Sequence, residues 1–145
     1  HRYGRRQRQM CIRDSASHDT PATRNGKRIH VTDIDEIDLA TVAIGLKPSK
    51  GKSEGLAMLT PMVEAGTRLY RNSSGALSLA YVADGRLDAY VETHMHSWDF
   101  MAGALIVRQA GGVLRDFDVT AALTEGAPVI ASNGRLDLML PPAYS

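Results

Sequence analysis

The sequence predicts an α/β fold in which helices flank a mixed sheet. Three observations support this prediction: short β-branched apolar runs, longer segments with helical spacing between them, and glycine or serine at the junctions. Strands and helices follow one another along the chain, and no internal repeat is visible. Helices are therefore expected to cover at least one face of the sheet.

The size and composition indicate one domain with its own core. The chain has 145 residues, of which 43% are hydrophobic. No stretch reaches the roughly 18 apolar residues of a membrane span, and the arginine-rich N-terminus lacks a secretory apolar region. The single cysteine cannot form an internal disulfide. We therefore expect a cytoplasmic protein that does not bind a membrane.

The first 15 residues differ in composition from the rest. They carry five arginines and one aspartate, and the net charge without them falls from +1 to −3. Such a segment is either a basic arm for nucleic acid or an assembly remnant. Residues 10–15 (MCIRDS) resemble the translation of a transposon-end adaptor from sequencing libraries, which favours the remnant. We expect residues 1–15 to be non-native and outside the fold, and the mildly acidic remainder predicts no nucleic-acid partner.

The N-terminal third predicts a hairpin, a loop and a buried strand. The pair Asn25-Gly26 tolerates positive φ and is typical of a type I′ turn between two short strands. The acidic residues 32–40 predict a loop or a short helical turn. Residues 40–46 (ATVAIGL) predict a buried strand, and the polar residues 47–55 that follow predict a loop.

Apolar residues at near-helical spacing predict a helix within residues 53–70. Ser53 is a candidate cap for this helix, and Leu69 belongs to its apolar set. Pro61 is expected to kink the helix or to split it in two.

A second helix is predicted after Ser73 or Ser74, either of which can cap it, and it ends at Gly85 in the left-handed conformation. Residues 86–93 then alternate as a strand, with Glu92 near its carboxyl end. Along this strand Asp88, Tyr90 and Glu92 share one face. The expected apolar stripe of the helix comprises Ala76, Leu77, Ala80, Tyr81 and Ala83.

Residues 96–112 (HSWDFMAGALIVRQAGG) predict a helix that is apolar almost all round and ends at two glycines. Such a helix is expected to pack on more than one side. Asp99 lies at its N-cap or in its first turn, where backbone N–H groups lack partners and the helix dipole favours a negative charge. Two further strands are predicted at 112–119 and 127–133, and a last helix is expected to begin within 134–140.

Taken singly, the candidate site residues have ordinary structural explanations. Asp99 suits a helix cap, and Glu92 suits a solvated strand end. His94 and His96 can share a zinc ion only with a third ligand, which the sequence does not clearly place. There is no phosphate-binding loop, dinucleotide fingerprint or G-x-S-x-G elbow.

Taken together, two linked motifs resemble the inositol monophosphatase family. The family pattern is Gly-Ser-Ala-Ala-Leu before a helix, a strand ending in Glu, and then Trp-Asp-x-x-Ala-Gly followed by Ala-Gly-Gly. The hairpin at 22–32 and the stretch VIASN at 129–133 also resemble family segments, so the resemblance covers about residues 20–140. The matching positions are Ser74, Ala76, Leu77, Glu92, Trp98, Asp99, Ala102, Gly103, Ala110, Gly111 and Gly112.

The resemblance implies a metal-dependent phosphomonoesterase, usually with Mg²⁺, that has a layered α/β/α/β/α sandwich fold and is often a homodimer. It implies that Asp99 is a metal ligand and that Glu92 contacts a substrate hydroxyl. It also implies that the helix starting at Ser74 and Gly75 directs backbone N–H groups toward the substrate. A carboxylate suits Mg²⁺, which prefers oxygen ligands. The expected partner is a small phosphorylated metabolite, such as an inositol phosphate.

The sequence departs from the family pattern in two ways. Ser73 stands where the family has glycine, so a Cβ is added near the expected approach of the substrate. The family motifs Gly-x-Glu-Glu and Asp-Pro-x-Asp-Gly-Thr, which supply other metal ligands and activating residues, are not found in the sequence. Residues 16–145 are therefore predicted to be the C-terminal half of such a phosphatase domain, without catalytic residues of its own and inactive alone.

Two alternatives stay open. Within the same family, the intact protein is a 3′(2′),5′-bisphosphate nucleotidase, a histidinol phosphatase or a sugar bisphosphatase, although Glu92 favours a polyol. In a different class, the chain is a non-catalytic α/β interaction domain in which Asp99 is only a helix cap.

Overall fold

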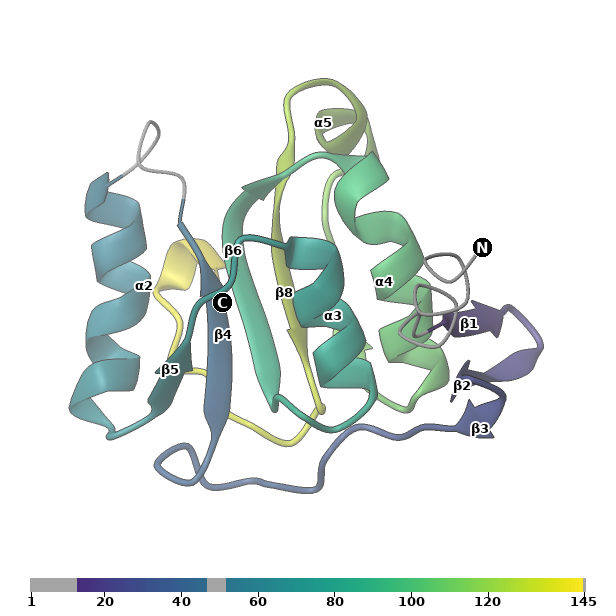
Figure 1. Ribbon diagram of the computed structural model, residues 1–145. Helices are drawn as coiled ribbons and strands as arrows, with labels where there is room; N and C mark the ends of the chain where they lie inside the picture. Colours follow the sequence, from purple (N-terminus) through teal and green to yellow (C-terminus); the bar gives the residue numbers. More distant parts are fainter. Residues whose placement is uncertain (1–12, 47–51, 145) are drawn as a thin grey trace, which may run out of the picture.

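The computed structural model describes residues 13–46 and 52–144, which form two sheets and their flanking helices (Figure 1). The smaller sheet is antiparallel, with strand order β1-β2-β3. The larger sheet has the order β5-β4-β6-β8-β7 and is mixed, because β4 is parallel to β5 and β6 whereas β8 is antiparallel to β6 and β7. The strands are β1 (Asp14–Ser17), β2 (Thr20–Arg24), β3 (Lys27–Arg28), β4 (Thr41–Gly45), β5 (Arg68–Tyr70), β6 (Ala89–Met95), β7 (Val113–Leu114) and β8 (Ala127–Ser132).

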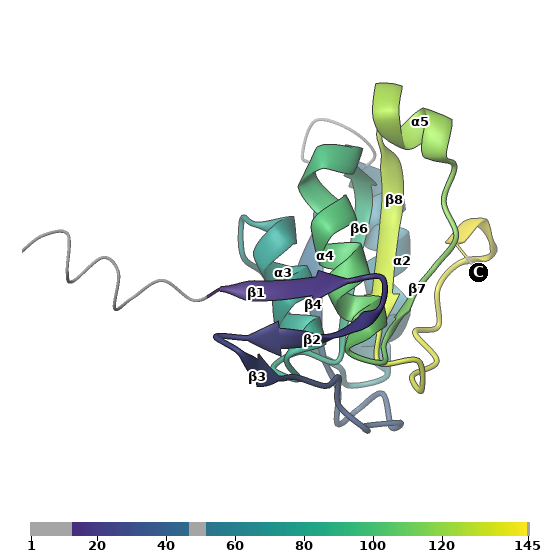
Figure 2. The ribbon, with the colours of Figure 1, turned by 90° about the vertical axis from the view of Figure 1, so that its right-hand side faces the viewer.

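The helices lie on both faces of the larger sheet, which confirms the predicted fold class (Figure 1). On one face α2 (Lys52–Glu64) buries Met58 and Met62 against β4 and β6. On the other face α3 (Gly75–Ala83) and α4 (Ser97–Gln109) pack against the sheet and against each other. The smaller sheet lies beyond α4 (Figure 2), so the layers run sheet, helices, sheet, helix.

A close contact joins α3 to α4. A Cβ placed on Gly103 of α4 would lie 2.7 Å from the Cβ of Leu79 in α3, so the contact requires a glycine at this position. Leu79 is fully buried, and Phe100 and Val107 of α4 are buried in the same cluster. The two helices therefore meet through apolar packing that any side chain on Gly103 would separate.

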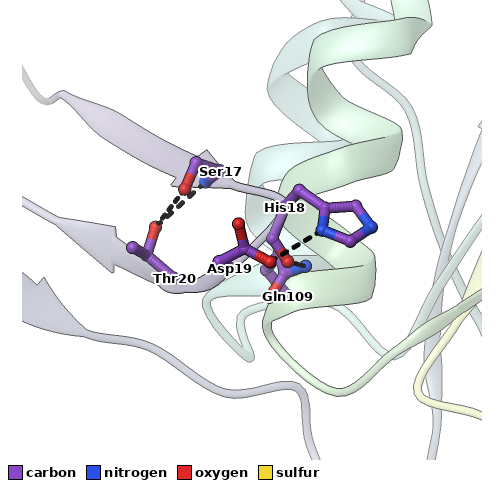
Figure 3. A network of polar contacts seen from close by, with 5 residues as sticks. All are labelled: Ser17, His18, Asp19, Thr20 and Gln109. Atoms are coloured by element: carbon purple, nitrogen blue, oxygen red, sulfur yellow. Dashed lines mark hydrogen bonds and ion pairs between the residues drawn. The ribbon is translucent and has the colours of Figure 1, made fainter.

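The turn between β1 and β2 is attached to the end of α4 (Figure 3). The hydroxyls of Ser17 and Thr20 share a hydrogen bond of 2.8 Å across the turn, and His18 Nδ1 lies 2.8 Å from Asp19 Oδ1. The side-chain amide of Gln109 donates to the carbonyl of His18 at 2.9 Å. The small sheet is thus fixed to the helix layer by polar contacts as well as by apolar packing.

The Asn-Gly turn between β2 and β3 is confirmed, because Asn25 and Gly26 have φ of 51° and 79°. The prediction that residues 1–15 lie outside the fold is wrong for Asp14 and Ser15, which pair with β2 as part of β1. Backbone hydrogen bonding to a neighbouring strand places them in the fold. Residues 1–12 lie outside the described residues, so the rest of that prediction stays untested.

The region predicted as one long helix contains a helix and a strand. α2 begins at Lys52, so Ser53 lies inside the helix and does not cap it, and Pro61 is accommodated without splitting it. Leu69 belongs to β5, which pairs with β4. The predicted loop at 47–55 falls partly on residues 47–51, which lie outside the described residues.

The buried face of α3 matches the predicted stripe only in part: Ala80 and Ala83 are buried and Tyr81 packs against the core. Ala76 and Leu77 are exposed, whereas Ser78 is 1% exposed. The Ser78 hydroxyl donates hydrogen bonds to Asn72 Oδ1 and to the Ser74 carbonyl, each at 3.1 Å, which makes burial of a polar side chain favourable. A pattern that counts only apolar residues therefore misses Ser78, which lies on the buried face of α3.

The expectation that α4 packs on more than one side is confirmed, because α4 contacts α3, the smaller sheet and the larger sheet, although part of its apolar surface stays exposed. Phe100, Ala104 and Val107 are buried, but Trp98 and Met101 are 70% and 50% exposed. The exposed pair borders a shallow apolar cavity of about 200 Å³ next to α5 (Val119–Thr124), a short helix that the sequence pattern did not predict. Within the described residues, none of the helices is long and apolar enough to cross a membrane.

The prediction of a helix beginning within residues 134–140 is wrong. This segment has no regular secondary structure and leads into a short 3₁₀ turn, η1 (Pro142–Tyr144). The Asp137 carboxylate accepts the backbone N–H of Met139 at 2.9 Å, and Met139 adopts a φ of 51°. Such a local bond competes with helix formation, and the prolines that follow disfavour it further.

A buried polar network closes the amino end of β6. Asp88 is 6% exposed and accepts the Thr32 hydroxyl at 2.6 Å and the Thr41 backbone N–H at 2.7 Å. The Asn133 side chain donates to Thr32 Oγ1 at 3.0 Å and to the Ile34 carbonyl at 2.7 Å. This network attaches the loop before β4 to the sheet.

Candidate functional site

The topology of the larger sheet singles out the carboxyl ends of β4 and β6. These strands are neighbours, yet the chain leaves β4 toward α2 on one face and leaves β6 toward α4 on the other (Figure 1). In open α/β sheets, ligands bind beyond the carboxyl ends of the strands at such a switch point. Gly45 and Glu92 are register partners at this edge.

The N-terminus of α3 is fixed by Ser74 beside this edge. Ser74 has extended backbone angles, and its hydroxyl accepts the N–H of Leu77 at 3.3 Å. Asn72 Oδ1 accepts the backbone N–H of Ser74 at 2.9 Å. Of the two predicted caps, Ser74 is therefore the cap, and its hydroxyl is used within the helix end.

Gly75, the first residue of α3, makes room for two side chains of β6. A Cβ on Gly75 would lie 2.7 Å from the Tyr90 hydroxyl oxygen and 2.4 Å from the methyl carbon of Met95. Tyr90 is 2% exposed and Met95 is 6% exposed, so both side chains are held in place by packing. The start of α3 and the end of β6 therefore meet at the Tyr90 hydroxyl.

Glu92 lies over the end of β4. Its Oε2 atom would be 1.7 Å from a Cβ on Gly45, and it lies 3.3 Å from the Tyr90 hydroxyl, which donates to it. Burial raises the pKa of Tyr90 most, and the negative charge of Glu92, the bond to it and the charge of Asp99 raise it further. The phenol therefore stays protonated and acts as a hydrogen-bond donor.

Asp99 lies in the first turn of α4 and is exposed. The N-cap residue is His96, which makes no side-chain capping bond. The Asp99 carboxylate accepts no hydrogen bond and forms no ion pair within the described residues. The explanation of Asp99 as a capping side chain is thus wrong, and its oxygens face solvent rather than a dry core.

The structure brings most of the predicted site residues to one edge. Gly75 and Glu92 both approach the Tyr90 hydroxyl, and Asp99 is near enough for its charge to act on that group. Ser74 adjoins this group but directs its hydroxyl to α3 itself. Their individual roles in binding substrate or metal remain predictions.

Three residues of this edge were not singled out from the sequence. Tyr90 carried a signal, because the alternation placed it on the same face as Glu92. Gly45 and Met95 carried none that could be used, since their roles depend on the pairing of β4 with β6 and on the docking of α3.

The two histidines near the site contact each other, and one of them, His96, stacks on Trp98. The rings of His94 and His96 are 5.3 Å apart and perpendicular, and His96 lies parallel to Trp98 at 4.5 Å. Across residues 13–46 and 52–144, no three His, Cys, Asp or Glu side chains gather as a metal-binding group. Asp99 by itself fits one ligand position of a hard cation, which commonly uses one or two carboxylates together with substrate phosphates.

Comparison with known proteins matches the family expected from the motifs. The model of the inositol monophosphatase family matches residues 13–142. The Nus factor SuhB of Haemophilus influenzae is 36% identical over 117 residues, covering 79% of this chain and 44% of that protein. An inositol-1-monophosphatase of Mesorhizobium japonicum is 44% identical over 63 residues, covering 43% of this chain and 24% of that protein.

A solved structure shows the same architecture. The extragenic suppressor protein SuhB of Bartonella henselae superposes with a TM-score of 0.78 at 28% identity, covering 86% of this chain and 48% of that one. The chain thus spans about half the length of these relatives.

Proposed function

This chain belongs to the inositol monophosphatase family, and on that premise we propose that its intact protein hydrolyses a small phosphate monoester such as an inositol phosphate. The observation that carries the proposal is the convergence of Gly75, Glu92 and the Asp99 charge on the Tyr90 hydroxyl, at the switch point of the sheet. Within the family, a polyol phosphate is favoured because Glu92 presents a carboxylate to hydroxyl groups.

The proposed roles follow the chemistry of the groups. The start of α3 at Ser74 and Gly75 directs backbone N–H groups toward the substrate, as helix N-termini do for anionic or polar ligands. The small Gly75 permits close approach. Glu92 accepts a substrate hydroxyl and thereby orients the leaving group.

Asp99 is proposed as one ligand of a catalytic Mg²⁺. Its carboxylate is exposed and without a hydrogen bond in the described part of the chain, which leaves its oxygens available to a cation. When bound, such an ion neutralises phosphoryl charge and lowers the pKa of bound water. α4 holds the ligand rigidly, because Phe100, directly after Asp99, is fully buried.

The remaining properties of the whole protein are also proposals. The chain matches about half of its relatives, and the two acidic motifs of the family are not found in it. We therefore propose that it is inactive alone and that the intact protein is a cytoplasmic homodimer. The 3′(2′),5′-bisphosphate nucleotidase, histidinol phosphatase and sugar bisphosphatase activities are the alternatives within the family.

The metal proposal is tested on the chain itself. Mn²⁺, a paramagnetic substitute for Mg²⁺, should broaden the NMR signals of residues around Asp99, and Asp99→Asn should abolish this selective broadening. Asp116→Asn, at an exposed aspartate outside the site, is the matched control and should leave it unchanged. Equal broadening in Asp99→Asn and the unchanged chain would remove Asp99 from the metal site.

The activity of the chain is tested separately. In millimolar Mg²⁺, the isolated chain should show no hydrolysis of inositol 1-phosphate above a blank. Comparing inositol phosphate, a nucleotide and histidinol phosphate in the intact protein distinguishes the substrates. Measurable turnover by the isolated chain at rates typical of enzymes would contradict the proposal that it is inactive alone.

A second candidate function belongs to another class. Several relatives carry the name Nus factor, and α4 and α5 expose Trp98, Met101, Val119 and Leu123 around an apolar cavity. These observations favour a non-catalytic interaction domain. In that case Asp99→Asn would leave Mg²⁺ binding by the intact protein unchanged, whereas Trp98→Ser would weaken partner binding.

A further inference from the structure

We propose that Tyr90 is a positioning residue, whose hydroxyl holds the Glu92 carboxylate over Gly45 so that Glu92 meets a substrate hydroxyl in one orientation. This inference rests on the proposed polyol phosphate function, and it adds a specificity-determining residue to that site. It concerns a buried side chain that would touch no substrate itself.

The position of the Tyr90 hydroxyl is fixed from several sides. The side chain is 2% exposed, and its oxygen lies 3.3 Å from Glu92 Oε2 and 3.5 Å from the sulfur of Met95. The start of α3 approaches from the other side, since a Cβ on Gly75 would come within 2.7 Å of the same oxygen. A hydroxyl so enclosed has one well-defined location.

The hydroxyl has two acceptors and one proton. Glu92 offers a carboxylate and Met95 a thioether, and a charged acceptor forms the stronger bond. The proton is therefore directed to Glu92. The phenol keeps that proton, because burial and the two nearby carboxylates raise the pKa of Tyr90.

Glu92 needs such a support because its own side chain is flexible. It is only partly buried, and three side-chain torsions separate its carboxylate from the backbone of β6. The bond from Tyr90 holds Glu92 Oε2, and the missing side chain of Gly45 leaves room for that atom. A carboxylate that accepts one such bond retains acceptor sites for a ligand hydroxyl.

The consequence is a specific effect on recognition. Without the Tyr90 hydroxyl, Glu92 loses one of the contacts that order its carboxylate, and the remaining ordering occurs when the ligand binds, which weakens binding by about three- to tenfold. The loss should fall on ligands whose hydroxyl groups reach Glu92. A phosphate ester without hydroxyl groups should bind as before.

The test compares two phosphates on the 145-residue chain in the presence of Mg²⁺. D-myo-inositol 1-phosphate carries ring hydroxyls, and cyclohexyl phosphate has the same ring size without them. Dissociation constants are read from the ¹³C-methyl signal of Met95, which lies beside the site. Tyr90→Phe should raise the constant for the inositol ester about three- to tenfold and leave that for the cyclohexyl ester unchanged.

Two further measurements separate positioning from folding. Met95→Leu, followed on a backbone amide of α3, removes the competing acceptor and should keep the preference for the inositol ester. A crystal structure of Tyr90→Phe should show Glu92 displaced from its place over Gly45. Glu92 in its original place, or an undiminished preference in Tyr90→Phe, would overturn the proposal.

The experiment also distinguishes this inference from the proposed function. If the unchanged chain does not prefer the inositol ester, the polyol assignment fails, and the Glu92 position in the Tyr90→Phe structure still decides the positioning role. Displacement of Glu92 then supports positioning, and retention of its place overturns it.

Discussion

Two aspartates lie near the two ends of β6 and differ in their burial and in their hydrogen bonds. Asp88, just before the strand, is 6% exposed and accepts the Thr32 hydroxyl and the Thr41 N–H. Asp99, just after it in the first turn of α4, is exposed and accepts no hydrogen bond within the described residues. The same kind of side chain is thus a buried hydrogen-bond acceptor at one end and an exposed carboxylate at the other.

The difference shows how this sheet separates stability from function. At the amino end, a network of hydrogen bonds attaches the loop to the strands around the buried Asp88. At the carboxyl end, Gly45 and Gly75 leave space for side chains, and carboxylates approach it from β6 and α4. The residues that we propose as binding groups lie where the glycines leave room, which fits the rule for ligands in open α/β sheets.

The largest effect on stability is expected at the amino end. Asp88→Ala should lower the free energy of unfolding by about 2–4 kcal/mol, because the Thr32 hydroxyl and the Thr41 N–H lose their acceptor in a buried site. Urea denaturation measures the change. Asp88→Asn retains one acceptor oxygen and should lower the free energy of unfolding less than Asp88→Ala does. An Asp88→Ala variant as stable as the unchanged chain would show that Asp88 is not a structural acceptor at the amino end of β6.

A smaller effect on stability is expected from a substitution at Gly45, the last residue of β4. Gly45→Ala places a Cβ against Glu92 Oε2, so the carboxylate moves and the bond from Tyr90 is lost. The tip of a long side chain can move cheaply, and the free energy of unfolding should change by about 1 kcal/mol or less. Affinity for an inositol ester should fall nonetheless. A large loss of stability would show that this end is as tightly built as the other.

Asp99→Asn should change the free energy of unfolding by a still smaller amount. It removes a favourable charge from the first turn of α4, which is worth a few tenths of a kcal/mol at an exposed position. Thermal denaturation with and without Mg²⁺ measures this. A cost comparable to that of Asp88→Ala would assign Asp99 a structural role.

The smallest effect, with the opposite sign, is expected at Asp14 in β1. Burial and the nearby Asp84 raise the pKa of Asp14 above its ordinary 3.8, against the lowering influence of Arg24 and Arg86. The folded chain therefore binds this proton more tightly than the unfolded chain, and stability decreases as the pH rises through the raised pKa.

Replacement by asparagine removes that dependence. Asp14→Asn should raise the free energy of unfolding by a few tenths of a kcal/mol at neutral pH, since the site is partly exposed. The gap should narrow as the pH falls toward 4, as urea titrations at several pH values would show. A gap that widens on acidification would contradict the assigned cause.

Local chemistry made part of this fold predictable. The Asn25-Gly26 turn, the Ser74 cap and the strand at β4 follow from short-range preferences that the tertiary structure leaves intact. The strand β5 was not predicted from the sequence, because its three residues are all exposed and it forms only by pairing with β4. The helix α5 was not predicted either, because Ala122 is its one buried residue in the described structure. A single buried residue gives no apolar stripe that a sequence pattern could detect.

The candidate site divides in the same way. Glu92 and Asp99 were singled out because they match motifs of the family that the sequence resembles, and the structure places them near the same end of β6. The contributions of Gly45 and Tyr90 depend on which strands are neighbours and in what register. No local pattern encodes that information.

The contact of Gly103 with Leu79 has a consequence for the site that lies away from it. Because α3 and α4 meet there without an intervening side chain, their packing fixes the two helices relative to each other, with Gly75 in the first turn of α3 and Asp99 in the first turn of α4. The distance between Gly75 and Asp99 therefore depends on the apolar contact of Gly103 with Leu79 in the interior. A single methyl group added at position 103 would push α3 and α4 apart and change the distance between Gly75 and Asp99, although it would contact no polar atom of the site.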